Sequence, residues 1–163
     1  METARDIQRS LEMVRESDQP AMTMIAGSPG VGKTEAIKRH CAQIGQDAMY
    51  IQAAKGEGTA WSFALTLASL WGYSAPRFNT LAEARLLLSR YIGERRLLMV
   101  DEAQYLHQKN GKTGQVGEAF EWIRATADMG RFDVVFCGDL TLVSAINVMP
   151  QLQSRMLRPV VIK

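Results

Sequence analysis

Short apolar runs alternate along the chain with longer segments whose apolar residues recur every three or four positions. The short runs predict buried strands at 21–26, 48–52, 97–100, 134–137 and 160–162. The longer segments predict helices at 3–17, 33–44, 59–71, 81–92, 118–129 and 140–148, with a helical turn at 150–156. Strands that are largely apolar throughout are covered on both faces, which is typical of parallel sheets. The pattern therefore predicts a three-layer α/β fold in which helices cover a mainly parallel five-stranded sheet.

Turn and capping signals mark the boundaries of several elements. Pro20 ends the first helical segment, and the glycine-containing polar segments 53–58 and 108–117 are predicted loops. Thr80 and Glu83 have the spacing of a capping box at the start of the helix that follows them. We therefore expect an N-terminal helix and linker over residues 1–20, followed by one α/β core over residues 21–163.

Composition narrows the class of protein only slightly. The chain has 163 residues, of which 47% are hydrophobic and 22% charged, and its formal net charge is +2. These values are ordinary for a single globular domain, and the net charge does not by itself indicate a nucleic-acid partner. No apolar run is long enough to cross a membrane, and the polar start is unlike a signal peptide. Cys41 and Cys137 lack metal-binding spacing, so we expect free thiols in a cytoplasmic protein with no membrane partner.

The first candidate for chemistry is the glycine-rich segment after the strand at 21–26. It matches the phosphate-binding loop G-x-x-x-x-G-K-[ST] at every fixed position, with Gly27, Ser28, Pro29, Gly30, Val31, Gly32, Lys33 and Thr34. Glycines let backbone N–H groups surround a phosphate at a helix N-terminus. The lysine neutralises the β- and γ-phosphates, and the threonine hydroxyl ligates the Mg²⁺ that bridges them. The segment therefore predicts a site for a nucleoside triphosphate, with ATP and Mg²⁺ as the expected ligands.

Two acids follow the apolar strand at 97–100. The carboxyl ends of strands in α/β sheets are where ligands bind, so Asp101 and Glu102 are expected beside the phosphate loop. Asp101 suits the outer coordination of Mg²⁺ through water, and Glu102 is placed to polarise the water that attacks the γ-phosphate. A strand also ends in acids when it simply reaches solvent, but the phosphate loop favours the metal-and-water interpretation. The pair therefore predicts hydrolysis of ATP to ADP and phosphate.

The strand at 134–137 is expected to lie between the strand of the phosphate loop and the strand of the two acids. That order would place Asp139 between the loop and Glu102, where a polar residue senses the γ-phosphate or holds the attacking water. Asn, Ser or Thr is the usual residue there, because an Asp repels phosphate oxygens unless it faces water or a cation. Asp139 is therefore either a catalytic sensor or the cap of the following helix.

The order of phosphate loop, Asp-Glu strand, sensor strand and late arginine resembles the AAA+ ATPases. Within that class it is most similar to the family of the phage Mu B transposition protein, the ATPases that select targets for transposition. The resemblance is carried by residues 27–36, 100–106, 137–139 and 152–156. It implies an AAA+ type P-loop core, a homo-oligomer in the ATP state, non-specific binding of duplex DNA, and a transposase or other protein partner. The helical lid and the N-terminal helix-turn-helix module of such proteins are not expected in this sequence, which is either a minimal homologue or a fragment.

The resemblance also assigns roles to an arginine and to three lysines. Arg155 is the candidate arginine finger for the γ-phosphate of a neighbouring subunit, with Arg158 as the competing candidate and a solvated surface arginine as the alternative. Lys55, Lys109 and Lys112 lie in loops that line the central channel of assembled relatives. They are candidate contacts to DNA phosphates, and ordinary solvated loops are the alternative.

Three functions are compatible with these motifs. The first is an ATPase that assembles on DNA in transposition target selection. The second is an ATP-dependent switch or scaffold that recruits a protein partner without binding DNA. The third, a nucleotide kinase, is disfavoured by Asp101 and Glu102 and by the absence of an arginine-rich lid.

Overall fold

A parallel sheet forms the middle layer of the computed structural model, which describes residues 2–17, 20–74 and 77–163. Its strands are β1 (Met22–Gly27), β2 (Ala48–Gln52), β3 (Leu97–Asp101), β4 (Asp133–Gly138) and β5 (Val160–Ile162). They lie in the order β2-β3-β4-β1-β5, and every neighbouring pair is parallel. The predicted α/β fold and five-stranded parallel sheet are confirmed. Strand β4, which Asp139 follows, also lies where the sequence predicts, between β1 and β3.

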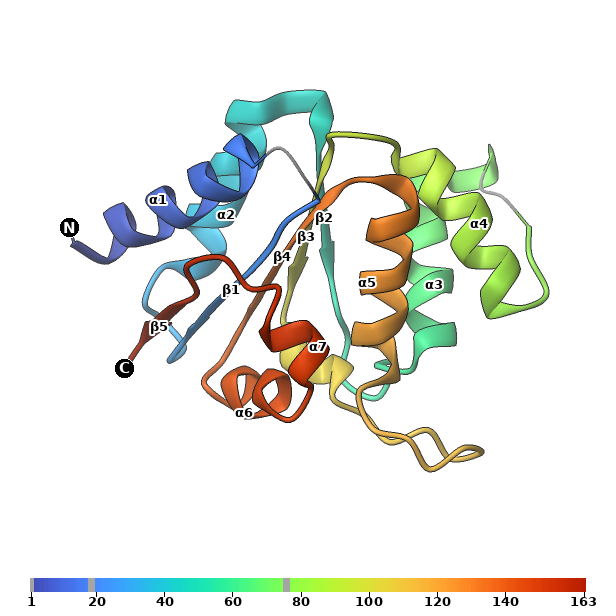
Figure 1. Ribbon diagram of the computed structural model, residues 1–163. Helices are drawn as coiled ribbons and strands as arrows, with labels where there is room; N and C mark the ends of the chain where they lie inside the picture. The colour runs from blue at the N-terminus through green and yellow to red at the C-terminus, as the bar shows by residue number, and fades with distance from the viewer. Residues whose placement is uncertain (1, 18–19, 75–76) are drawn as a thin grey trace.

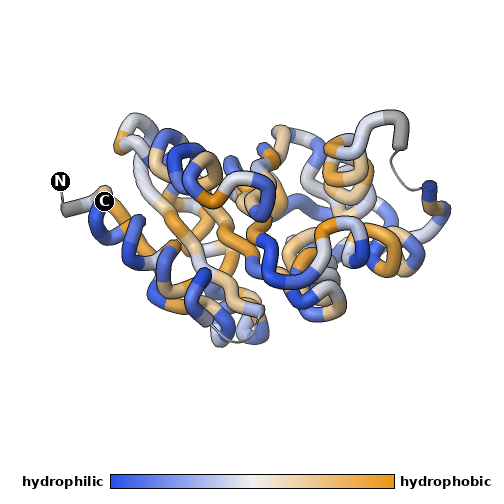
Figure 2. Tube along the Cα trace, turned by 90° about the horizontal axis from the view of Figure 1, so that it is seen from above, coloured by the Kyte–Doolittle hydropathy of each residue, from blue (hydrophilic) through white to orange (hydrophobic). Residues whose placement is uncertain are grey.

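Helices cover both faces of this sheet (Figure 1). One face carries α1 (Glu2–Glu16) and α2 (Lys33–Ile44). The other carries α3 (Ala60–Ala68), α4 (Leu81–Ile92), α5 (Glu118–Gly130), α6 (Thr141–Asn147) and α7 (Pro150–Gln153). Figure 2 shows hydrophobic segments gathered in the interior and hydrophilic segments outside. No helix in the described part of the chain is long and apolar enough to cross a membrane.

Alternate residues of strands β1 to β4 lie in two separate cores. In β3, Leu98 and Val100 join the core under α3 to α7, whereas Leu97 and Met99 join the core under α1 and α2. Because side chains alternate across a strand, a strand buried on both faces is apolar at every position. This is the physical reason why the sequence shows continuous apolar runs. Cys137 belongs to the second core, and both cysteines are free thiols, as expected.

Helix α1 packs on the sheet core that it shares with α2. Its Ile7, Leu11 and Val14 are buried against β1 and α2. The Ser10 hydroxyl donates to the carbonyl of Arg158, and the Arg158 guanidinium lies 3.3 Å from the Asp6 carboxylate. These contacts fasten the segment before β5 to α1.

Three segments differ from the sequence prediction. The predicted helix at 59–71 ends as an α-helix at Ala68 and is followed by 3-10 turns over Ser69–Ser74. Gly72 interrupts these turns, because its backbone is non-helical with φ of 60°. The predicted turn at 150–156 is shorter, since the chain leaves α7 to pair Leu157 N–H with the carbonyl of Met22. The loop at 108–117 contains an isolated antiparallel bridge that turns it into a small hairpin, which extends below α5 in Figure 1.

Helix α4 begins with a capping box in which one of the two hydrogen bonds has a different backbone donor from the usual one. Thr80 accepts the backbone N–H of Glu83 at 3.1 Å, as expected. The Glu83 carboxylate accepts the N–H of Asn79 at 2.9 Å, so the reciprocal bond reaches one residue further back. The predicted start of this helix is confirmed.

Candidate active site

The phosphate loop connects β1 to α2, and its glycines meet two different requirements. Gly30 and Gly32 have φ of 84° and 87°, in the left-handed region that side chains rarely adopt. Gly27 instead lies close to β5, where an added Cβ would sit 3.0 Å from the Cβ of Ile162. The loop therefore needs glycine for its curvature at two positions and for close packing at a third.

Lys33 lies across this loop. Its ammonium donates to the carbonyls of Gly27 at 2.8 Å and Ser28 at 3.0 Å. Phosphate oxygens carry more negative charge than carbonyl oxygens, so a phosphate that enters the loop competes well for the same ammonium.

Asp101 ends β3 as a buried carboxylate, with an exposed fraction of 2%. Its Oδ2 accepts the Thr34 hydroxyl at 2.9 Å and the Tyr50 hydroxyl at 2.6 Å. Its Oδ1 accepts the backbone N–H of Glu102 at 2.9 Å. All three donors come from different parts of the chain, so the position of this carboxylate is firmly fixed.

These oxygen atoms fit a magnesium ion. Hydroxyl and carboxylate oxygens are the ligands that Mg²⁺ prefers, and Mg²⁺ usually keeps several waters and binds substrate phosphates. The described residues hold no cluster of three or more His, Cys, Asp or Glu side chains that would form an all-protein metal cage. Thr34 and Asp101 would therefore hold the ion together with a nucleotide, Asp101 through water.

Tyr50 was not predicted as a site residue. It lies on β2 with its ring 5.1 Å from the Lys38 ammonium, and burial and its bond to Asp101 raise the pKa of its hydroxyl above the usual value. Tyr50 is paired in register with Met99, two residues before Asp101. Only this strand register reveals the contact, and a single sequence does not display register.

Gln104 joins Glu102 to the end of β4. Glu102 has a left-handed backbone, with φ of 53°, and the 3-10 helix Ala103–Leu106 follows it. Within that turn, Gln104 Nε2 donates to Glu102 Oε2 at 2.6 Å. Gln104 Oε1 accepts the backbone N–H of Asp139 at 3.2 Å. Sequence reasoning gave Gln104 no role, because the turn that directs its side chain was not predicted.

The Asp139 side chain is engaged with the following helix. Its Oδ1 accepts the backbone N–H of Thr141 at 2.9 Å and also the Thr141 hydroxyl. These bonds match the capping alternative. The sensor role of Asp139 stays a prediction.

Two hollows flank the phosphate loop. One is lined by Pro29, Gly30, Gly32, Lys33, Thr34, Glu35 and Glu102. The other lies between the loop, α2 and the start of α1, where Thr3, Ala4 and Ile7 line it. The structure thus brings the loop, Asp101 and Glu102 together at the carboxyl edge of the sheet, as the sequence predicts.

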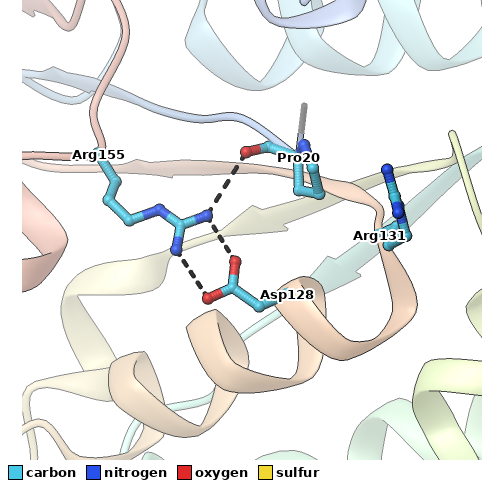
Figure 3. Close-up of a pocket in the computed structure, with 4 residues that line it drawn as sticks. All are labelled: Pro20, Asp128, Arg131 and Arg155. Atoms are coloured by element: carbon cyan, nitrogen blue, oxygen red, sulfur yellow. Dashed lines mark hydrogen bonds and ion pairs between the residues drawn. The ribbon is translucent and has the colours of Figure 1, made fainter. Parts of the chain in front are cut away.

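Arg155 lies near the start of β1, beside Pro20 and Asp128 (Figure 3). Its guanidinium makes a bidentate ion pair with the Asp128 carboxylate, with N–O distances of 2.7 Å and 2.5 Å. It also donates to the carbonyl of Pro20 at 3.5 Å. These three residues and Arg131 line one surface pocket. Pro20 precedes β1 whereas the phosphate loop follows it, so Arg155 does not reach the loop of its own chain. The finger role stays a prediction that requires a second copy.

The three candidate DNA-binding lysines are exposed on loops that lie close together. Lys55 belongs to the loop after β2, and Lys109 and Lys112 belong to the hairpin at 108–117. The two segments are joined where Gly58 N–H donates to Gln108 Oε1 at 2.8 Å. Both follow the carboxyl ends of neighbouring strands.

Comparison with known proteins identifies the class. A family model described as an AAA domain matches residues 15–145, and the chain belongs to this family. Its members share the P-loop NTPase core and are generally ATPases. No curated protein matches the sequence.

Solved structures with the same fold include replication initiation proteins. An Orc1 protein of Aeropyrum pernix, in complex with DNA, matches with a TM-score of 0.65 and 18% identity over 98% of this chain and 44% of that one. AMPPCP-bound DnaA from Aquifex aeolicus matches with a TM-score of 0.59 and 18% identity over 100% of this chain and 47% of that one. Domain III of the Thermotoga maritima DnaA protein matches with a TM-score of 0.52 and 25% identity over 99% of this chain and 61% of that one. The chain therefore spans less than two thirds of each of these relatives and shares their AAA+ fold.

Proposed function

We propose that this protein is an Mg²⁺-dependent ATPase that works as an assembly on duplex DNA. The observation that carries the proposal is the meeting of Lys33, Thr34, Asp101 and Glu102 at one edge of the sheet. A nucleotide-binding protein without hydrolytic activity needs the first three residues but has no use for Glu102. In this proposal ATP is hydrolysed to ADP and phosphate.

The chemistry follows from the position of each group. Backbone N–H groups of the loop and the Lys33 ammonium bind the phosphates, and bound Mg²⁺ neutralises their charge. Glu102 accepts a proton from a water molecule while the water oxygen forms a bond to the γ-phosphorus and the bond to ADP breaks. One Glu102 oxygen is engaged by Gln104, which leaves the other to orient the water.

The two hollows on either side of the phosphate loop suggest how a bound nucleotide is oriented. With the γ-phosphate toward Glu102, the base and ribose extend toward the hollow beside α1. Thr3, Ala4 and Ile7 then form one wall of the base site. This placement gives α1 a role in binding as well as in packing.

The arginine that completes each site is proposed to come from a second copy. Arg155 is held away from its own loop by Asp128 and Pro20, so only another molecule's γ-phosphate is within its possible reach. An arginine at that position stabilises charge that develops in the transition state. This requirement makes the active form a homo-oligomer in the ATP state.

Binding to duplex DNA and a role in transposition target selection are proposed on separate grounds. The exposed lysines on two adjoining loops suit phosphate contact without base reading. Solved proteins of the same fold include one in complex with DNA and one bound to single-stranded DNA. The transposition role, with a transposase as partner, is supported by the motif similarity to the Mu-type family.

The second candidate function is an ATP-dependent switch that recruits a protein partner without DNA. The net charge of only +2 favours this alternative.

One experiment separates these functions. The ATPase rate is measured against protein concentration, with and without duplex DNA, and DNA binding is measured with and without ATP. We expect a rate per molecule that rises with concentration and with DNA, and duplex binding only with ATP. ATP hydrolysis without duplex binding, even at low salt, would replace the DNA function with the switch. Absence of hydrolysis under every condition would contradict both the ATPase and its mechanism.

A further inference from the structure

The side chain of Gln104 connects two strands at the catalytic edge. Its amide N–H donates to Glu102 after β3, and its carbonyl accepts from the backbone of Asp139 after β4, at 2.6 Å and 3.2 Å. A carboxamide has a donor and an acceptor on one planar group, so it can serve both partners at once. Gln104 therefore ties the position of the Glu102 carboxylate to the end of β4.

Gly138 provides the space for this bridge. A Cβ at residue 138 would overlap Gln104 Oε1. Gly138 has no positive φ that would otherwise demand glycine. Glycine at this position thus allows close approach of the carboxamide.

The bond has a direct consequence for Glu102. A carboxylate on a long side chain loses rotational freedom when one oxygen is anchored, and positioning a reacting group in advance lowers the barrier of the step it serves. The Gln104 amide cannot take up a proton from Glu102, so the anchor leaves the proton acceptor intact. Oε1 of Glu102 stays available to water.

We propose that Gln104 is the positioning residue of the hydrolytic site. It holds Glu102 in the orientation that polarises water and couples that orientation to the end of β4. This inference rests on the proposed function, in which Glu102 is the general base. Gln104 is not among the residues that line the hollow beside the phosphate loop, whereas Glu102 is, so its effect passes through Glu102.

Two variants remove the bridge by different routes. Gln104→Met keeps the length of the side chain and removes both polar partners, and Gly138→Ala displaces an unchanged Gln104. We expect each to lower kcat by about tenfold or more, with the Kd for ATP unchanged. Gln104→Glu is the third variant, because it keeps the shape but replaces the donor with a like charge beside Glu102. It is expected to lose at least as much turnover.

Matched controls separate this effect from a general loss of structure. Gln8→Met removes a glutamine that donates to Glu12 on the surface of α1 at 2.9 Å. Gly111→Ala adds a methyl group where nothing lies within 4 Å. Both controls, measured without DNA, are expected to keep the wild-type kcat. Thermal unfolding and ATP binding confirm that each variant is folded, and any one folded bridge variant suffices for the test.

A double-mutant cycle tests the route of the effect. In a Glu102→Gln background, Gln104→Met is expected to cause no further loss of kcat, because the residue through which it acts is already gone. An equal loss in both backgrounds would overturn the proposal, as would an unchanged or raised kcat in folded Gln104→Met. If Glu102→Gln alone keeps the wild-type rate, the proposed catalytic function fails instead, so the two failures are distinguishable.

Discussion

At the scale of single residues, Asp101 holds two hydroxyl donors on one oxygen. The Thr34 hydroxyl is the one that turns to Mg²⁺ in the proposed site, and the Tyr50 hydroxyl then remains as the bond that fixes Oδ2. A fixed carboxylate binds metal-held water with less loss of entropy than a mobile one. We therefore expect the Tyr50 hydroxyl to lower the Mg²⁺ concentration that the ATPase needs for its half-maximal rate.

The variant Tyr50→Phe tests this expectation. It keeps the ring beside Lys38 and removes only the hydroxyl that donates to Asp101. We expect the Mg²⁺ concentration for half-maximal ATPase rate to rise by about tenfold or more, as is usual when an outer-shell partner of a metal ligand is lost. A magnesium titration of the steady-state rate measures this. An unchanged titration curve would limit Tyr50 to a packing role.

Lys33→Ala is expected to abolish measurable ATP binding. Lys33 is the only cation among the residues that line the hollow with Glu102, so no other ammonium or guanidinium there replaces it. Isothermal calorimetry with ATP and Mg²⁺ measures the effect. An ATP affinity close to the wild-type value would contradict the assignment of the phosphate site.

The site residues that the sequence predicts belong to local motifs, whereas those that it misses depend on contacts between distant or turned segments. Lys33 and Glu102 sit in short contiguous motifs, and the order of the strands then brings them together. Gln104 and Tyr50 depend on a short turn and on the register between two strands, and neither is visible in local sequence. Such contacts become apparent only in three dimensions.

At the scale of elements, the contact between α1 and α2 contains a buried histidine. His40 has an exposed fraction of 5%, and neither ring nitrogen has a hydrogen-bond partner among the described residues. Burial lowers its pKa below the usual 6.5, Glu12 partly opposes the shift, and Arg15 adds to it. The folded protein therefore keeps His40 neutral at pH values where the unfolded chain is already protonated.

This difference predicts a loss of stability in mild acid. Well above pH 6.5 the residue is neutral in both states and contributes nothing to the pH dependence. As the pH falls below that value, the unfolded state gains a proton that the folded state does not, so the free energy of unfolding decreases. His40→Leu removes the group that titrates, and the drop in Tm between pH 7.5 and pH 5.5 is expected to be smaller than in the wild type. Equal drops in the two proteins would contradict the prediction.

Elements that bury two apolar faces were the easiest to predict. Strands β3 and β4 are recognisable because both of their faces lie in apolar cores. The end of α7 was harder, since it depends on the hydrogen bond from Leu157 to Met22 at the far end of the sequence. Local pattern determines the type of an element well, whereas a distant partner often determines where the element stops.

At the scale of the whole molecule, a mixing experiment tests whether the site is shared. Arg155→Ala and Lys33→Ala are each expected to be inactive alone. Mixed in equal amounts, they form contacts that join an intact Arg155 to an intact loop, so part of the ATPase activity returns. Steady-state rates of the mixture measure this recovery. A mixture that stays inactive, together with wild-type rates independent of concentration, would show that one chain contains the complete site.

The lysine loops are tested with duplex DNA. The triple variant Lys55→Ala, Lys109→Ala and Lys112→Ala is expected to bind more weakly and with a flatter salt dependence. Each lost phosphate contact lowers the slope of log K against log salt by about 0.9. ATPase activity without DNA is the control and should not change. A salt slope equal to that of the wild type would place the DNA elsewhere or exclude it.

The location of the phosphate loop and Arg155 near opposite ends of β1 gives any row of these molecules a polarity. Each contact would join the loop end of one copy to the Arg155 end of the next, which is a head-to-tail arrangement. An open row then has one complete site fewer than it has copies, whereas a closed ring has as many sites as copies. The two end molecules of a row are chemically different, because one holds a nucleotide that lacks its arginine and the other presents an unused arginine. Growth and loss of subunits would therefore proceed at different rates at the two ends.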